Sequence, residues 1–232
     1  MAAAALALSP AQAAQSKRGA RAADAALEEP ASPDELDLAE DEEPEGEEAD
    51  VRSEAATRVL DWVAASRDNG DLPYMVIDKN AGTLFLLDAE GKALGQAPVL
   101  IGLATGDDSS PGVGSKKLAQ LGPAEKTTPA GRFLAKYGWA AGKQKVLWVD
   151  YATSVALHAV VTGNKKERRL ERLASPSPED NRVTFGCINV PVEFYKKTVQ
   201  PLFAKTGGIV YVLPDTRPLE EVFPRVQVAP YL

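Results

Sequence analysis

Apolar residues recur at helical spacing in residues 51–70, which follow the acidic segment of the chain. The repeating positions, three and four residues apart, are Ala56, Val59, Leu60 and Val63. This period predicts an amphipathic helix that packs on the following domain, with Asp50 or Ser53 as its cap. Asn69 and Gly70 are typical of a helix stop, so the helix is expected to end before them.

Short apolar runs separated by turn residues follow, and they predict β-strands. Residues 74–78 and 83–88 flank a glycine-containing turn and predict a β-hairpin. Further strands are predicted at residues 96–102, 132–137, 145–151, 155–161 and 209–213. Two helices are predicted, at residues 164–173 and 191–203, the second with proline in its first turn. We therefore expect a mainly β domain with a few helices (α+β).

The segments outside this domain differ in composition. Residues 1–14 are small and apolar and are predicted to be a signal peptide or its remnant, which favours export. Residues 15–50 are predicted to be a disordered acidic linker, because 14 acidic and no basic side chains fall within residues 24–50. From residue 51 onward the balance is reversed, with 23 Lys or Arg against 19 Asp or Glu. Residues 215–232 are predicted to be a C-terminal tail.

The chain has one cysteine, Cys187, and one histidine, His158. A single cysteine cannot form a disulfide within the chain or supply a cysteine-rich zinc site, so no metal or cofactor is assigned. After the leader no apolar run reaches the length of a membrane helix, so no membrane span is expected in the mature chain. No nucleic-acid partner is expected, and the oligomeric state stays open.

Cys187 lies in the run Thr184-Phe-Gly-Cys-Ile-Asn189, and its surroundings indicate a nucleophile. A thiolate attacks carbonyl carbon well, and His158 is the only imidazole available to take its proton. Because Pro191 follows closely, Cys187 is expected near a helix N-terminus, which would stabilise the thiolate. The alternative is an inert cysteine that packs as a small hydrophobic residue, which is the more common fate of a free cysteine.

Three features occur in an order that resembles the L,D-transpeptidase catalytic domain (YkuD-like) family. They are Thr128-Pro-Ala-Gly131-Arg-Phe133, a strand bearing His158, and Thr184-x-Gly186-Cys187-Ile-Asn189. The resemblance covers about residues 73–214. It implies an L,D-transpeptidase-like β-sandwich of mixed sheets that handles peptidoglycan. In such domains a cysteine attacks a stem tetrapeptide, releases D-alanine and passes the acyl group to an amine.

The resemblance also implies roles for individual residues. Cys187 corresponds to the nucleophile and His158 to the base. The N–H groups of Gly186 and Cys187 would stabilise the tetrahedral oxyanion. Thr184 is expected to hold the cysteine loop by hydrogen bonds, and Asn189 to orient that loop or a substrate carboxylate.

The chain departs from the family pattern in three places. Phe185 stands where a second histidine is usual, so a hydrogen-bonding group is replaced by an apolar ring that could contact substrate. The 25 residues between His158 and Thr184 make an unusually long gap that contains a basic insert. This insert is expected to cap the cleft and bind substrate carboxylates, or to be a solvated surface helix; its test residues are Arg168, Arg169 and Arg172.

The third departure is Ala159, which follows the histidine where Gly or Ser is common. The change is tolerable if a backbone carbonyl orients the imidazole. Asp150 is a candidate orienting carboxylate only because it is near in the chain.

The leading hypothesis is an exported peptidoglycan L,D-transpeptidase of the periplasm or cell envelope. Its partners would be stem peptides, and its products 3-3 cross-links or wall-attached proteins. Two alternatives remain open. One is a catalytically inactive wall-binding module; the other is a thiol peptidase or amidase that gives the acyl group to water.

Overall fold

The computed structural model describes residues 52–140 and 144–231. The predicted signal segment at residues 1–14 and the predicted acidic linker at residues 15–50 lie outside these ranges. All of the secondary structure below belongs to one unit, Glu47–Leu232.

The described residues form an eight-stranded sheet of mixed direction. Its spatial order is β3 (Ala93–Pro98), β2 (Thr83–Leu87), β1 (Tyr74–Asp78), β10 (Gly208–Val212), β5 (Gly131–Trp139), β6 (Lys145–Asp150), β7 (Val155–Ala159) and β9 (Ile188–Val190). The pairs β1–β10 and β7–β9 are parallel, and the other neighbours are antiparallel. Two short strands, β4 (Ile101–Gly102) and β8 (Arg182–Thr184), pair in parallel as a second sheet. The prediction of a mainly β fold with mixed sheets is confirmed.

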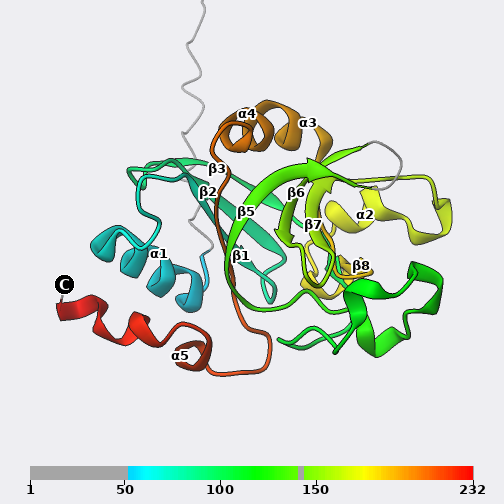
Figure 1. Ribbon diagram of the computed structural model, residues 1–232, viewed down its shortest axis with the longest axis horizontal. Helices are drawn as coiled ribbons and strands as arrows, with labels where there is room; N and C mark the ends of the chain where they lie inside the picture. The colour runs from blue at the N-terminus through cyan, green and yellow to red at the C-terminus, as the bar shows by residue number, and fades with distance from the viewer. Residues whose placement is uncertain (1–51, 141–143, 232) are drawn as a thin grey trace, which may run out of the picture. The chain divides into compact units, whose positions relative to one another are not determined.

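One face of the large sheet is covered by helices from both ends of the described chain. Helix α1 (Glu54–Ser66) begins after Ser53, whose hydroxyl accepts a hydrogen bond from the Ala56 N–H at 3.0 Å. Figure 1 shows α1 beside α5 (Leu219–Val222) and the C-terminal 3-10 helix (Pro224–Tyr231). Trp62 and Phe223 bury their rings here against Tyr211 of β10. Leu219, Phe223 and Val226, which lie in the predicted C-terminal tail at residues 215–232, are buried in this core.

The other face of the sheet encloses the larger core. Its buried side chains come from both halves of the sheet, including Met75 of β1, Leu147 of β6 and Leu157 of β7, so the sheet curves around them. A helix made of α3 (Val192–Phe194), a π-helical turn (Tyr195–Val199) and α4 (Gln200–Phe203) covers this core. Figure 1 shows α3 and α4 on the side of the sheet away from α1.

The strand pattern differs from the sequence prediction around the cysteine. Residues 188–190 form β9 rather than the approach to a helix, so Cys187 precedes a strand and the predicted helix N-terminus at Cys187 is wrong. The reason is that Ile188 and Val190 are fully buried and pair with β7. The basic insert folds as a 3-10 turn (Lys165–Glu167) followed by α2 (Arg169–Leu173).

Candidate active site

The parallel pair β7–β9 brings the two chemically interesting residues to one place. In the register of this pair His158 lies opposite Asn189, and Leu157 lies opposite Ile188. Cys187 immediately precedes β9 and is two residues before Asn189. The pairing thus places Cys187 beside the strand that carries His158, although 28 residues separate them in sequence.

The Cys187 thiol is half-buried and faces backbone. Its Sγ lies 3.8 Å from the Ser154 carbonyl oxygen, to which the thiol donates. Burial raises the pKa of Cys187, while the Ala156 backbone and the Arg169 charge oppose that rise. Among the residues that the structure describes, no hydrogen bond joins Cys187 to His158. Burial therefore disfavours the thiolate at Cys187 in this conformation.

The His158 ring is held at both nitrogens. Nδ1 lies 2.8 Å from the Ala159 carbonyl oxygen, and Nε2 lies 3.3 Å from Nδ2 of Asn189. Burial lowers the pKa of His158 and the Arg169 charge lowers it further, against the contact with Ala159. The backbone carbonyl of Ala159 orients the imidazole. Asp150 does not, because its carboxylate accepts hydrogen bonds from the Thr153 hydroxyl and the Ala152 N–H.

The cysteine loop is closed by the side chain of Thr184. Its hydroxyl donates to the Cys187 carbonyl at 2.6 Å and accepts from the Gly186 N–H at 3.2 Å. The Gly186 N–H, expected to face a substrate oxyanion, is therefore occupied inside the loop in this conformation. Gly186 has φ +119°, and a Cβ there would lie 2.7 Å from the Thr127 carbonyl oxygen. Glycine is needed at this position for both conformation and space.

The loop rests on a neighbouring segment that sequence reasoning treated only as part of the resemblance. The Thr128 hydroxyl donates to the Gly186 carbonyl at 2.8 Å and accepts from the Gly102 N–H at 2.9 Å. The carbonyl of Thr128 in turn accepts a hydrogen bond from Nζ of Lys79 at 2.9 Å. Lys79 directly follows β1 and begins the turn between β1 and β2.

Lys79 is the centre of a buried charge cluster that sequence reasoning missed. Its side chain is 0% exposed and its Nζ lies 3.0 Å from Asp107 Oδ1 and 3.3 Å from Asp215 Oδ2. Arg182 completes the cluster by pairing with Asp215 at 2.8 Å. Burial acts to raise the pKa of Asp107, but hydrogen bonds from the backbone of residues 215–217 and the Thr216 hydroxyl hold that pKa below its usual range. No sequence motif marks these residues, which meet only through the fold.

Phe185 takes part in a contact between its ring and a cation. Nζ of Lys126 lies 4.2 Å from the centroid of the half-buried Phe185 ring. A cation over an aromatic face is attracted by the ring quadrupole. The position that is usually histidine in the resembled family thus presents an aromatic face beside a positive charge.

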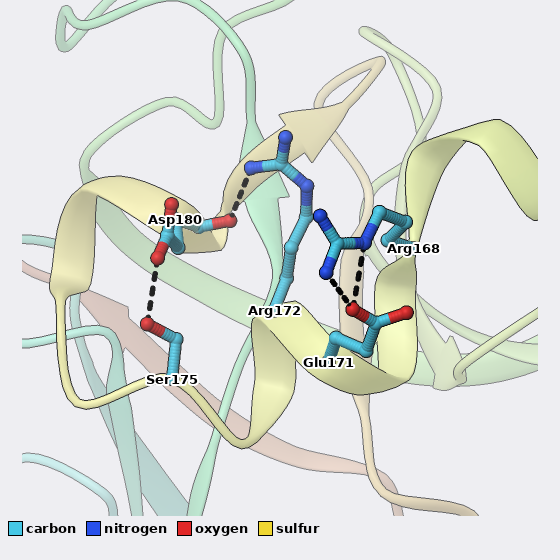
Figure 2. A pocket seen from close by; sticks show the side chains of 5 residues that line it. All are labelled: Arg168, Glu171, Arg172, Ser175 and Asp180. Atoms are coloured by element: carbon cyan, nitrogen blue, oxygen red, sulfur yellow. Dashed lines mark hydrogen bonds and ion pairs between the residues drawn. The ribbon is translucent and has the colours of Figure 1, made fainter.

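The three arginines of the basic insert have different surroundings. Arg169 reaches the site: its Nη1 donates to Asn189 Oδ1 at 2.8 Å, and its Nε donates to Glu167 Oε2 at 2.6 Å. Arg168 pairs with Glu171, and Arg172 donates to the Asp180 carbonyl at 2.8 Å. Figure 2 shows Arg168 and Arg172 in a polar pocket of about 340 Å³ whose lining does not include Cys187 or His158. The structure therefore brings Arg169, but not Arg168 or Arg172, to the catalytic candidates.

Within residues 52–140 and 144–231, no three His, Cys, Asp or Glu side chains come together as a metal site would require. In that part of the chain, no helix combines the length and the apolar character needed to cross a bilayer.

Comparison with known proteins gave matches among solved structures. No protein-family model and no curated protein matches the chain. The catalytic domain of an L,D-transpeptidase from E. faecium is 15% identical, with a TM-score of 0.38, over 62% of this chain and 98% of that one. An L,D-transpeptidase from Xylanimonas cellulosilytica is 12% identical, with a TM-score of 0.37, over 68% of this chain and 80% of that one.

A third similar structure is the helical cell shape determining protein Pgp2 from Campylobacter jejuni. It is 13% identical, with a TM-score of 0.39, over 74% of this chain and 59% of that one. The chain also spans only 48% of the solved chain described as the Ldtfm-avibactam carbamoyl enzyme. At such identities and TM-scores, roles of individual residues do not transfer between chains.

Proposed function

We propose that this chain is a cysteine-dependent acyltransferase of the L,D-transpeptidase type that acts on peptidoglycan stem peptides. The observation that supports the proposal is the β7–β9 pair, in which His158 lies opposite Asn189, two residues after the chain's one cysteine. The resemblance of the motifs around His158 and Cys187 supplies the substrate class. Export to the periplasm or cell envelope is proposed from the leader-like residues 1–14.

The proposed mechanism begins with a thiol whose pKa is raised by burial and an imidazole whose pKa is lowered by burial. As the sulfur attacks the acyl carbon, the thiol proton passes to Nε2 of His158, the nitrogen that the Ala159 carbonyl leaves unprotonated. In the resting conformation Asn189 Nδ2 lies 3.3 Å from the same nitrogen, and the thiol displaces this long contact during the transfer. Collapse of the tetrahedral intermediate returns the proton to the departing D-alanine amine and leaves a thioester on Cys187.

The second half of the reaction reverses these roles. An acceptor amine attacks the thioester carbonyl, His158 removes the amine proton, and the thiol is regenerated. Oxyanion stabilisation is proposed for the Cys187 N–H, since the Gly186 N–H is bound to Thr184. Phe185 with Lys126 offers an apolar face and a positive charge to the substrate. Arg168 and Arg172 are engaged within the insert, so no substrate contact is proposed for them.

The test uses the full chain and a Cys187→Ser variant as matched control. Incubation with iodoacetamide or a carbapenem, followed by intact-mass and peptide mass spectrometry, should give one adduct, located on Cys187. The variant should give none. An unmodified thiol in the folded wild-type chain would support the inactive wall-binding module.

Incubation with tetrapeptide muropeptides then identifies the acceptor. Dimers joined by 3-3 links, with release of D-alanine, support acyl transfer to an amine. Tripeptide monomers alone would show hydrolysis and replace the proposal by a thiol peptidase. Unchanged muropeptides in the presence of a reactive Cys187 would refute this substrate class.

A further inference from the structure

Arg169 contacts the candidate base through one intermediate side chain. It is the first residue of α2, in the insert between His158 and Cys187, and its side chain is only 13% exposed. Its guanidinium donates from Nη1 to Asn189 Oδ1 at 2.8 Å, and Asn189 Nδ2 lies 3.3 Å from His158 Nε2. Glu167 holds the other side of the guanidinium at 2.6 Å.

The direction of every hydrogen bond in this series is fixed by chemistry. A guanidinium can only donate, so the amide atom that faces Arg169 must be the oxygen. The amide nitrogen then faces His158, and because it can only donate, Nε2 must accept. At the other end of the ring the Ala159 carbonyl can only accept, so Nδ1 must carry the proton. Both ends of the ring thus require the same tautomer.

We propose that Arg169 is a positioning residue that fixes the Asn189 amide and thereby holds His158 with its proton on Nδ1 and its lone pair on Nε2. The inference rests on the proposed function of His158 as the base. Without Arg169 the amide can rotate and present its oxygen to the ring. Nε2 would then be protonated, and this nitrogen could no longer take the thiol proton. Burial lowers the pKa of His158, and the charge of Arg169 lowers that pKa further.

The chain allows a direct measurement of this tautomer. His158 is its only histidine, so a two-bond proton–nitrogen NMR spectrum of the 15N-labelled full chain contains one imidazole. The wild type should show a protonated Nδ1 and an unprotonated Nε2. In Arg169→Met the Nε2 signal should shift toward the protonated range and the His158 pKa should rise. Arg169→Lys, which retains a charged donor, should restore both values toward the wild type.

Two further variants make the result specific. Arg168→Met removes a neighbouring arginine that is 69% exposed and has no contact with Asn189, and it should leave the spectrum unchanged. Asn189→Asp replaces the amide by a carboxylate that cannot donate, so Nε2 should become protonated without any change at Arg169. The Asp variant also serves if Arg169→Met does not fold.

Unchanged nitrogen shifts in folded Arg169→Met, or an unprotonated Nε2 in Asn189→Asp, would overturn the proposal. The readout needs no substrate. If the tautomer shifts in these variants but the wild-type chain leaves muropeptides unchanged, the proposed function is refuted and the role of Arg169 in positioning the imidazole stands.

Discussion

Replacement of Lys79 by methionine tests whether the buried charge cluster holds the fold beneath the cysteine loop. The change keeps a long apolar stem and removes the ammonium that lies 3.0 Å from Asp107 and 3.3 Å from Asp215. Both carboxylates are 1% exposed, so water cannot replace the lost charge without local opening. The carbonyls of Gly106 and Thr128 also lose their donor.

The magnitude follows from what remains after the substitution. Removing one partner of a buried ion pair costs about 3–5 kcal/mol. Arg182 still pairs with Asp215, and backbone N–H groups still bind Asp107, which favours the lower part of that range. The carbonyls of Gly106 and Thr128, which lose their donor, increase the expected loss of stability. We therefore expect the free energy of unfolding to fall by about 4 kcal/mol.

Urea unfolding followed by tryptophan fluorescence measures this loss. With a slope of about 2 kcal/mol per molar urea, the midpoint should fall by about 2 M. The melting temperature should fall by about 8–16 °C for a domain of this size. Lys92→Met is the matched control, because Lys92 is exposed just before β3 of the same sheet and its replacement should change stability by less than about 0.5 kcal/mol. A Lys79→Met midpoint within about 0.5 M of the wild type would refute the reasoning.

Three other measurements follow from the site. Alkylation of Cys187 should accelerate with pH, with a midpoint above the ordinary thiol pKa, because burial raises that pKa; a fast plateau at acid pH would instead reveal an ion pair with His158. Gly186→Ala should lower the free energy of unfolding by about 1–3 kcal/mol, because of the positive φ and the Thr127 oxygen; an unchanged urea midpoint would contradict this. The pKa of Asp107 is depressed by its hydrogen bonds, so its stabilisation is complete above the unfolded carboxyl pKa of about 3.9 and is lost as pH falls toward the folded value. Wild-type stability should therefore fall more steeply below about pH 4 than that of Asp107→Asn, and parallel curves would count against this assignment.

Local patterns were sufficient for most of the elements. The hairpin of β1 and β2, the strands β5, β6, β7 and β10, and the helical segment after Pro191 all fall where apolar period and turn residues predicted them. These elements have strong local signals because each buries a continuous apolar stripe or run. The predicted third strand, by contrast, divides into β3 and β4, which belong to different sheets. A local pattern of apolar residues does not show where the chain leaves one sheet and begins to pair with a strand of another.

The chain's one thiol and one imidazole could be chosen from sequence because no other residue offers their chemistry. Their relation could not, since it depends on β9, a three-residue strand whose signal is too short to separate from a helix start. The same limit applies to the basic insert. Composition marks it as cationic, but only the fold shows that Arg169 faces Asn189 while Arg168 and Arg172 bind within the insert.

Sequence by itself thus determined the mainly β class, the candidate nucleophile and base, and the glycine that the cysteine loop requires. Tertiary structure decided the contact of Cys187 with the Ser154 carbonyl, the two contacts that hold the His158 ring, and the buried partners of Lys79. The physical reason is range. Helical period, turn chemistry and residue reactivity are properties of neighbours along the chain, whereas burial, pKa and hydrogen-bond direction are set by groups that only the folded chain brings together.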